Sequence, residues 1–216
     1  IAQKVGLENF KNFLGNLDLL NKTQFDIEEV GNPIPFKWGK CKLATSAYGH
    51  GITTTPLQLA KAYAIIANGG YKIKPTLIKK EKNLKRGEQI ISKENSKKIN
   101  DILRKIVTNE QGTANLANIS GYEIAGKTGT AQKSIKGKYS KKKINTFASI
   151  FPISSPKYVL IVLLDEPKLS ETYIYEYNDG KKRKIIGTPF NTAGWTSVEV
   201  AKNIIEKIGP ILAIKY

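Results

Sequence analysis

The sequence predicts an α+β fold, in which helices pack against an antiparallel sheet. Apolar residues keep a helical spacing through most of residues 1–120, and from Tyr122 onward their spacing shifts towards two, which is typical of strands. A last helical stripe follows the strands. This order indicates an α+β domain, because a parallel sheet would alternate strands with helices. We therefore expect residues 1–120 to be mostly helical and residues 121–216 to form a sheet hairpin and a terminal helix.

The chain has 216 residues, of which 40% are hydrophobic, so we expect one globular unit with a substantial core. It starts inside a predicted helix, contains no methionine and has no signal peptide or long apolar run. We expect it to be part of a longer protein, with any export signal or membrane anchor upstream. The single cysteine, Cys41, excludes an internal disulfide.

Thr53–Gln58 predicts the start of a helix. Thr55 suits the N-cap, Pro56 suits the first helical position, and Gln58 completes a capping box with Thr55. The Asn68–Gly70 segment then ends the helix. A wide apolar face is expected on this helix, formed by Leu59, Ala60, Tyr63, Ala64, Ile66 and Ala67.

Two further helices are predicted by single apolar stripes. The first, from about residue 92 to 109, carries Ile99, Ile102, Leu103, Ile106 and Val107. The last helix has Thr196 and Glu199 as a capping box and is expected to end at Gly209–Pro210. Its buried side is expected to contain Val198, Ala201, Ile204, Ile205 and Ile208.

Two strands are predicted at residues 146–152 and 158–165, joined by a polar turn as an antiparallel hairpin. The second is almost continuously apolar, which favours a central strand that is covered on both faces. The Asp165–Glu166 pair is expected to be a solvated strand end. Residues 171–184 are polar and basic, and we expect a mobile excursion near the groove without an assigned role.

The net charge of +17 raises the question of a nucleic-acid partner. Almost all the positive charge is lysine, whereas reading phosphates and bases favours arginine. The basic clusters at residues 79–86, 133–143 and 181–184 lie in segments predicted to be loops, with few aromatic residues among them. We therefore predict solvated loops and no nucleic-acid partner, and consider an anionic polymer or a membrane surface the better alternative.

The stretch Gly126–Gln132, GKTGTAQ, contains the most informative motif. With Gly121 it fits the G-x-x-x-x-G-K-T string of a phosphate loop, but the intervening residues predict a strand and no amphipathic helix follows. In a strand, Thr128 and Thr130 point to one side, and Gly129 lets a ligand approach the backbone. Two hydroxyls, an ammonium group and a free edge amide suit an acyl-transfer site for a carboxylate-bearing substrate.

This motif and an ordered series of other stretches resemble class B penicillin-binding proteins, in particular the C-terminal part of the transpeptidase domain of the division-specific (septal) peptidoglycan D,D-transpeptidases. The resemblance covers almost the whole chain and implies a penicillin-binding, serine β-lactamase-like transpeptidase fold, here incomplete. The matching stretches are Ala47–Ile52, Thr55–Ala60, Gly112–Ala114, Gly121–Gly129, Leu164–Pro167 and Thr192–Thr196.

The resemblance implies catalytic roles for Lys127, Thr128 and Thr130, whose backbone amide would be an oxyanion donor. It places Gly129, Ala131 and Gln132 along the substrate groove. The implied substrates are peptidoglycan stem peptides and β-lactams, and the implied partners are divisome membrane proteins. No cofactor or metal is implied. The implied location is the bacterial inner membrane, with the catalytic domain in the periplasm.

The family's nucleophile boxes, Ser-x-x-Lys and Ser-x-Asn, precede the Lys-Thr-Gly strand. No Ser-x-Asn occurs in this sequence, and both Ser-x-x-Lys strings, Ser140–Lys143 and Ser154–Lys157, follow the strand. We expect neither serine to be the nucleophile, so the chain alone would be inactive. The alternatives are a carboxypeptidase or β-lactamase of the same fold, or a non-catalytic binding module.

The remaining aromatic and histidine candidates have simpler structural interpretations. His50 lies between two glycines just before a helix start, where a turn residue is expected rather than a general base. Trp195 and Tyr48 could stack on a ligand, but we expect them to pack in a core or a turn.

Overall fold

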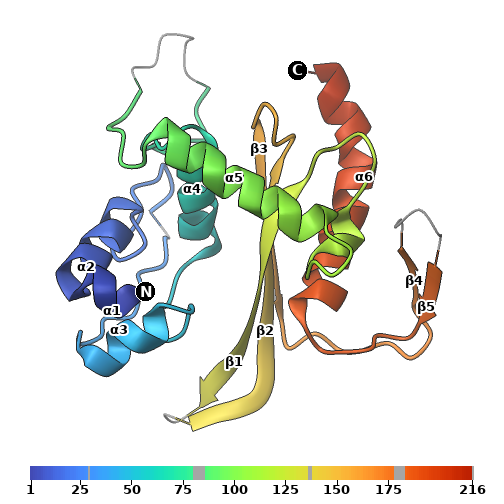
Figure 1. Cartoon of the computed structure of the whole chain (residues 1–216), viewed down its shortest axis with the longest axis horizontal. Helices are drawn as coiled ribbons and strands as arrows, with labels where there is room; N and C mark the ends of the chain where they lie inside the picture. Colours follow the sequence, from blue (N-terminus) through green and yellow to red (C-terminus); the bar gives the residue numbers. More distant parts are fainter. Residues whose placement is uncertain (29, 80–85, 136–137, 178–182, 216) are drawn as a thin grey trace. The chain divides into compact units, whose positions relative to one another are not determined.

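The structure is a computed structural model that describes residues 1–28, 30–79, 86–135, 138–177 and 183–215. The chain divides into two compact units, residues 1–96 and residues 97–216, where the sequence predicted one globular unit. Helix α5 (Lys93–Thr108) begins in the first unit and continues in the second (Figure 1). The two units are described separately below.

The first unit is mostly helical. It contains α1 (Ala2–Val5), α2 (Leu7–Asn16), α3 (Lys40–Ser46) and α4 (Pro56–Ala67). Its core gathers Leu17, Ala62, Ile65 and Ile91, with Leu19, Ile66, Ile73 and Ile90 packed around them. The unit is therefore held together largely by α4 and the segments beside it.

The start of α4 confirms the predicted capping box. Thr55 Oγ1 accepts from the Gln58 amide at 3.2 Å, and Gln58 Oε1 accepts from the Thr55 amide at 2.8 Å. The six residues of the predicted apolar face are only half-buried, although Ile66 packs against the core. The residues that the helix buries are Gln58, Lys61, Ala62 and Ile65. Two polar residues are buried here because each has a partner: the Gln58 side-chain amide donates to backbone carbonyls, and Lys61 forms an ion pair with Asp18.

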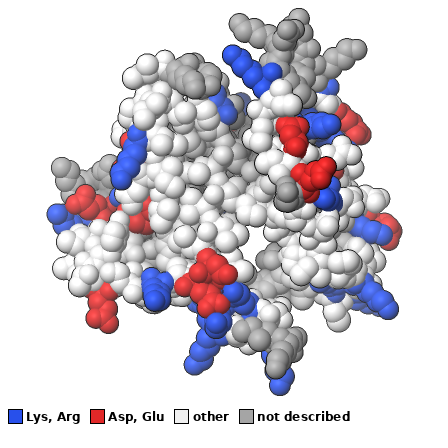
Figure 2. Space-filling model, turned by 180° about the vertical axis from the view of Figure 1, so that it is seen from behind, with Lys and Arg blue, Asp and Glu red and all other residues white. Residues whose placement is uncertain are grey.

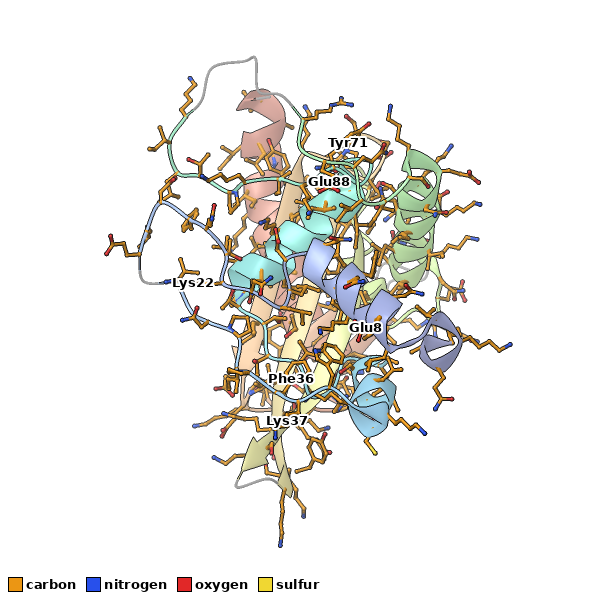
Figure 3. The ribbon with its side chains drawn as sticks, turned by 90° about the vertical axis from the view of Figure 1, so that its left-hand side faces the viewer. Glu8, Lys22, Phe36, Lys37, Tyr71 and Glu88 are labelled. Atoms are coloured by element: carbon orange, nitrogen blue, oxygen red, sulfur yellow. The ribbon has the colours of Figure 1, made fainter. Side chains whose placement is uncertain are left out.

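Outside its helices, the first unit contains a short pairing of two backbone segments. Tyr71 and Gln89 form an antiparallel bridge, and the Lys72 amide donates to the Glu88 carbonyl at 2.9 Å. Figure 3 labels Tyr71 and Glu88 on these neighbouring segments. Gly70 makes this approach possible, since a Cβ there would lie 1.8 Å from the Ile91 carbonyl oxygen.

Two aromatic residues that precede α3 in the chain contact each other. The Phe36 ring meets Trp38 at 4.9 Å between centroids, and the Lys42 ammonium lies 4.0 Å from the Phe36 centroid. His50 lies just after α3, where its amide donates to the Thr45 carbonyl at 3.0 Å. The His50 ring also lies 5.0 Å from the Tyr48 ring, which agrees with a turn residue.

Helix α5 matches its predicted range, but its predicted apolar stripe is only partly buried. Leu103 and Val107 are buried, whereas 58% of Ile102 is exposed. Ser96 and Asn100, both polar, are buried in its place. Counting apolar residues therefore identified the helix and most of its buried face, but it wrongly included Ile102 and missed the two buried polar residues.

The second unit is built on a three-stranded antiparallel sheet of β1 (Ala125–Ile135), β2 (Lys138–Phe151) and β3 (Tyr158–Asp165). The strand order is β1-β2-β3, which confirms the predicted hairpin of β2 and β3 (Figure 1). The predicted central position of β3 was wrong: within the described residues β2 is central, and 42% of Leu163 on β3 is exposed. An apolar run indicates a strand but does not determine its neighbours.

Helix α6 (Ser197–Lys215) packs on β2 and β3 and closes the main core. The core includes Phe147, Val198, Ala201 and Ile205, together with residues of the 3-10 turn η1 (Asn115–Ala117). The helix does not end at Gly209–Pro210 as predicted, because Pro210 lies inside it. Leu212, beyond the proline, still packs against the core, which offsets the missing backbone hydrogen bond.

The predicted capping box of α6 does not form. The Thr196 hydroxyl donates to the Thr192 carbonyl at 2.9 Å and accepts from the Asn145 side-chain amide at 2.9 Å. The Glu199 carboxylate accepts from the Tyr173 hydroxyl at 2.9 Å instead of turning back to the N-cap. Tertiary partners therefore replace the local cap.

The segment predicted as a mobile excursion contains a two-stranded sheet. Strands β4 (Ile174–Tyr177) and β5 (Arg183–Ile186) pair antiparallel, and residues 178–182 lie outside the described part. Tyr175 is buried and belongs to the main core. Its hydroxyl donates to the Trp195 carbonyl at 2.8 Å, which ties the hairpin to the 3-10 turn η2 (Ala193–Trp195).

The charged residues are not confined to one helix or strand. On the face that Figure 2 displays, the described Lys and Arg side chains are scattered among uncharged ones, and several stand beside acidic groups. The cluster at 133–143 is not the loop that the sequence predicted, since Lys133 and Lys138–Lys143 lie on β1 and β2. Alternating charged residues can occupy a solvent-facing hairpin, so composition did not identify these strands.

Candidate functional site

The predicted motif lies on β1, whose only described partner in the sheet is β2. In the register, Thr128 pairs with Phe147 and Thr130 pairs with Asn145. Directly paired residues point to the same face, so both threonines lie on the face where Phe147 and Asn145 are buried. The predicted common orientation of Thr128 and Thr130 is confirmed, and Lys127 belongs to the opposite face.

The glycine before the lysine has a packing role. A Cβ on Gly126 would lie 2.7 Å from atoms of the Phe147 ring and 2.6 Å from the Ala148 carbonyl oxygen. Gly126 is therefore required so that an aromatic core residue can pack against the backbone of β1. The extended conformation of residues 125–130 also argues against a phosphate loop, which would need a turn that opens into a helix.

Lys127 is exposed, and its ammonium group donates to the Thr128 carbonyl at 2.8 Å. An exposed contact of this kind contributes little and leaves the charge available to an anionic ligand. By alternation, the Lys127 side chain starts from the face of β1 opposite to the two threonines, and its ammonium group lies at the backbone between Thr128 and Gly129. Gly129 and Ala131 share that other face by alternation.

A cavity of about 300 Å³ lies beside the two threonines in the second unit. Its walls come from β1, from the segment before η1 and from η2. The lining residues are Gly112, Thr113, Asn115, Leu116, Thr128, Thr130, Thr192, Gly194 and Trp195.

Hydroxyl groups dominate the polar chemistry of this cavity. Thr113 Oγ1 lies 2.8 Å from Thr128 Oγ1, and the Ala193 amide donates to Thr130 Oγ1 at 3.0 Å. Both β1 hydroxyls thus have hydrogen-bond partners from distant parts of the chain. A wall of hydroxyls suits a ligand that only accepts hydrogen bonds, such as a carboxylate.

The backbone on either side of the cavity is closely packed. A Cβ on Gly112 would lie 2.1 Å from the Ile106 carbonyl oxygen, and a Cβ on Gly194 would lie 2.6 Å from the Thr113 carbonyl oxygen. The Asn115 side-chain amide donates to the Asn109 carbonyl at 3.1 Å. These contacts fix the position of Thr113 relative to η2.

The sequence did not identify Thr113, Thr192 or Trp195 as site residues. Trp195 packs edge-on against Tyr175 at 5.2 Å between ring centroids, as expected for a packing aromatic, and it also lines the cavity. Thr113 belongs to the Gly112–Ala114 stretch that carries part of the family resemblance. That resemblance could have pointed to Thr113 as a site residue, but it did not predict the contact of Thr113 with Thr128.

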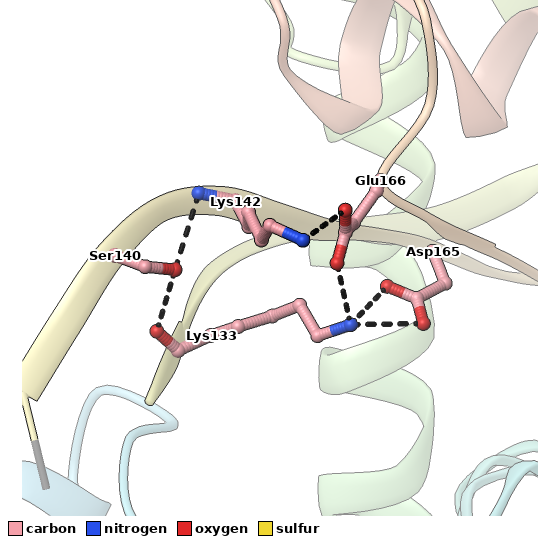
Figure 4. Close-up of polar contacts among 5 residues, drawn as sticks. All are labelled: Lys133, Ser140, Lys142, Asp165 and Glu166. Carbon is pink, nitrogen blue, oxygen red and sulfur yellow. Dashed lines mark hydrogen bonds and ion pairs between the residues drawn. The ribbon is translucent and has the colours of Figure 1, made fainter. Parts of the chain in front are cut away.

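Gln132 is exposed and pairs with Lys143 just before an irregularity in the β1–β2 register. Three residues of β2, Ser140–Lys142, stand opposite Lys133 alone. Ser140 fills this bulge: its hydroxyl donates to the Lys133 carbonyl at 3.1 Å and accepts from the Lys142 amide at 3.2 Å (Figure 4). The bulge therefore lies directly after the predicted groove residues.

Four charged side chains brace this end of the hairpin. Lys133 Nζ lies 2.9 Å from an Asp165 oxygen and 2.9 Å from a Glu166 oxygen, and Lys142 Nζ lies 3.0 Å from Glu166 (Figure 4). Hydrogen bonds to Glu166 and Asp165 raise the pKa of Lys133, and those from Lys133 and Lys142 lower the pKa of Glu166. Asp165 and Glu166 are exposed as predicted, but they are ion-paired as well.

The serines of the two Ser-x-x-Lys strings, Ser140 and Ser154, do not lie at a helix start. Ser140 is on β2 in the bulge, and Ser154 lies in the turn between β2 and β3, where its hydroxyl donates to the Glu123 carboxylate. Hydrogen bonds from Ser154 lower the pKa of Glu123. No basic residue activates either hydroxyl in the contacts described here, which agrees with excluding both as nucleophiles.

The described residues contain no cluster of three or more His, Cys, Asp or Glu side chains that could bind a metal ion. No helix in the same residues is long and apolar enough to span a membrane.

The sequence matches the family described as penicillin binding protein transpeptidase domain over residues 1–191. A curated relative, the probable peptidoglycan D,D-transpeptidase FtsI of Caulobacter vibrioides, is 30% identical over 226 residues, which cover 100% of this chain and 36% of that protein. The chain spans about a third of the length of the curated relatives it matches.

Solved structures share the fold. The transpeptidase domain of penicillin-binding protein 3 from Burkholderia pseudomallei superposes with a TM-score of 0.77 at 24% identity, covering 94% of this chain and 57% of that one. Penicillin-binding protein 3 from Mycobacterium tuberculosis, complexed with aztreonam, gives a TM-score of 0.75 at 25% identity, with 96% and 48% covered. These likenesses agree with the predicted α+β class.

Proposed function

The chain belongs to the family of penicillin-binding protein transpeptidase domains, and on this premise we propose that it supplies one wall of the active site of a serine D,D-transpeptidase. The reaction is the cross-linking of peptidoglycan in cell division, through an acyl-serine intermediate. The observation that carries the proposal is the pair of oriented hydroxyls, Thr128 and Thr130, on an edge strand beside a cavity of about 300 Å³.

The hydroxyls of Thr128 and Thr130 bind the terminal carboxylate of a D-Ala-D-Ala stem peptide or of a β-lactam. The Thr130 backbone amide donates to the oxyanion that develops on the attacked carbonyl. Lys127, on the other face, supplies positive charge to the substrate and assists proton transfer near the serine boxes. Gly129, Ala131 and Gln132 border the groove along which the peptide extends.

The nucleophile comes from Ser-x-x-Lys and Ser-x-Asn boxes that this chain does not contain before Lys127. The serine oxygen attacks the carbonyl of the penultimate D-Ala, the peptide bond to the terminal D-Ala breaks, and that residue leaves as the protonated amine. An amine of a neighbouring stem peptide then attacks the acyl-serine and releases the serine. No metal or cofactor takes part in this scheme.

Location and partners follow from the same premise. We place the catalytic domain in the periplasm, anchored in the bacterial inner membrane by a segment outside this chain, among divisome membrane proteins. The FtsI name of the Caulobacter relative supports a division role. The aztreonam complex of the Mycobacterium structure supports β-lactams as ligands of this site.

The second candidate is a carboxypeptidase or β-lactamase of the same fold, in which water replaces the amine acceptor. The third is a non-catalytic binding module, which the missing serine boxes favour for the chain in isolation. The Lys127–Thr130 strand is compatible with all three, since it binds the carboxylate and not the acceptor.

Labelling with a fluorescent penicillin tests the proposal on the complete gene product that contains this chain. We expect covalent labelling of that protein and none of the chain by itself. Labelling of the chain that is abolished by substituting Ser140 or Ser154 would show that the nucleophile was misassigned. With a pentapeptide donor and an amine acceptor, a cross-linked dimer in mass spectrometry indicates a transpeptidase, and free tetrapeptide alone indicates a carboxypeptidase.

A further inference from the structure

The Thr113 hydroxyl lines the cavity and contacts the Lys-Thr-Gly strand, but the proposed function gives it no role. Thr113 lies in the loop before η1, 15 residues from Thr128 in sequence, and the two Oγ1 atoms are 2.8 Å apart. Either oxygen could be the donor at this distance. The direction of this hydrogen bond decides whether Thr128 has a proton left for a ligand.

Thr130 shows the arrangement that carboxylate binding needs. Its Oγ1 accepts from the Ala193 backbone amide at 3.0 Å, and an amide N–H can only donate. The single proton of the Thr130 hydroxyl is therefore directed away from Ala193. It is available to a ligand oxygen in the cavity.

The same requirement fixes the direction of the Thr113 contact. A carboxylate only accepts hydrogen bonds, so Thr128 must donate its proton to the ligand and must accept from Thr113. We propose that Thr113 is a positioning residue, which donates to Thr128 and thereby directs the Thr128 proton into the cavity. This inference rests on the proposed function, because it takes a carboxylate as the ligand.

The backbone around Thr113 supports this role. The Thr113 carbonyl lies so close to Gly194 that a Cβ there would be 2.6 Å from its oxygen, and Gly112 is similarly packed under Ile106. The Thr113 side chain itself is exposed and lines the cavity. A fixed backbone with an accessible hydroxyl is suited to orienting a neighbour rather than to filling a core.

The test is a double-mutant cycle of Thr113→Val and Thr128→Val, measured as the second-order rate of acylation by benzylpenicillin in the complete gene product. We expect Thr113→Val to lower this rate about tenfold, since an oriented hydrogen bond to an ionised ligand is weakened. Thr113→Ser keeps the donor and should restore the rate to within about twofold of wild type. The double variant should react no more slowly than Thr128→Val alone.

Thr108→Val is the matched control, because the Thr108 hydroxyl donates only to the Arg104 carbonyl of its own helix at 3.2 Å. It should leave the rate unchanged. The proposal is overturned if Thr113→Val reacts like wild type, or if the losses of the two single variants multiply in the double variant. If Thr113→Val unfolds, the comparison of Thr113→Ala with Thr113→Ser serves the same purpose.

Failure of the proposed function gives a different result, namely that the wild-type protein is not acylated at all. The hydroxyl wall is then tested by titrating the chain with N-acetyl-D-alanine and following the Trp195 indole signal by NMR. A shift that is absent with N-acetyl-D-alaninamide, lost in Thr113→Val and retained in Thr113→Ser supports the inference. A wild-type chain that shows no carboxylate-dependent shift contradicts it.

Discussion

The two ends of the β1–β2 hairpin are held by different forces. At the base, Gly126 packs against the fully buried ring of Phe147. Beyond the groove, the strands are braced by Lys133 and its acidic partners, whose carboxylates are exposed. Buried apolar contacts are worth several times more than solvent-exposed ion pairs, so the base should position the site and the outer end should only adjust it.

Phe147→Ala tests the base and should have the largest effect. Removing a fully buried ring leaves a cavity next to the motif strand, and we expect a loss of about 3 to 5 kcal/mol in the free energy of unfolding. Urea denaturation of the wild type and the variant measures it. Leu163→Ala, at a half-exposed position of β3, is the control and should lose much less. Equal losses would show that the base is not the anchor of the hairpin.

Lys127→Ala and Thr130→Val test the segment between the two ends. Each should lower the rate of acylation by benzylpenicillin about a hundredfold in the complete gene product, because each removes a group that holds the ligand. Thr130→Val keeps the backbone amide, so it isolates the contribution of the hydroxyl. Unfolding midpoints should stay close to wild type, and an unchanged acylation rate in either variant would contradict the assigned role.

Gly126→Ala tests the same close approach at the base by adding a methyl group instead of removing the ring. The added Cβ would lie 2.7 Å from the Phe147 ring, and overpacking of this kind costs about 1 to 3 kcal/mol. Calorimetry of Gly126→Ala beside Gly129→Ala gives a matched pair, since a Cβ on Gly129 meets only one atom, at 4.0 Å. If both alanines have the same effect, the packing role of Gly126 is wrong.

Lys133→Met tests the outer end and should have the smallest effect on stability. The pKa of Glu166 is lowered in the folded state, so the stabilisation is present above its usual value of 4.5 and is lost as the pH falls through the folded pKa. The raised pKa of Lys133 implies a second loss as the pH rises above 10.5.

Wild type and Lys133→Met should therefore differ in melting temperature at pH 7 and low salt. The difference should shrink as the pH falls through the lowered pKa of Glu166, and it should also shrink in high salt, because these groups are exposed to solvent. Lys97→Met removes an exposed lysine from α5 and serves as a charge control. A difference that persists in acid would mean that Lys133 acts through packing and not through its ion pairs.

Much of the fold could be predicted from local sequence signals. The capping box at Thr55 and Gln58, the range of α5 and the β2–β3 hairpin follow from cap chemistry and periodicity, which act over a few residues. Errors arose where distant partners decided the outcome. Lys61 is buried because Asp18 pairs with it, and Pro210 is tolerated inside α6 because Leu212 beyond it reaches the core.

Residues 127–130 could be predicted as a strand whose two threonines share a face, because alternation is a property of any extended chain. The contacts of these threonines, in contrast, form only when distant segments of the chain pack together. Thr113 and Ala193 stand 15 and 63 residues away from their partners, and no local pattern encodes such a separation. The hydroxyl wall therefore depends on how η1 and η2 pack beside β1.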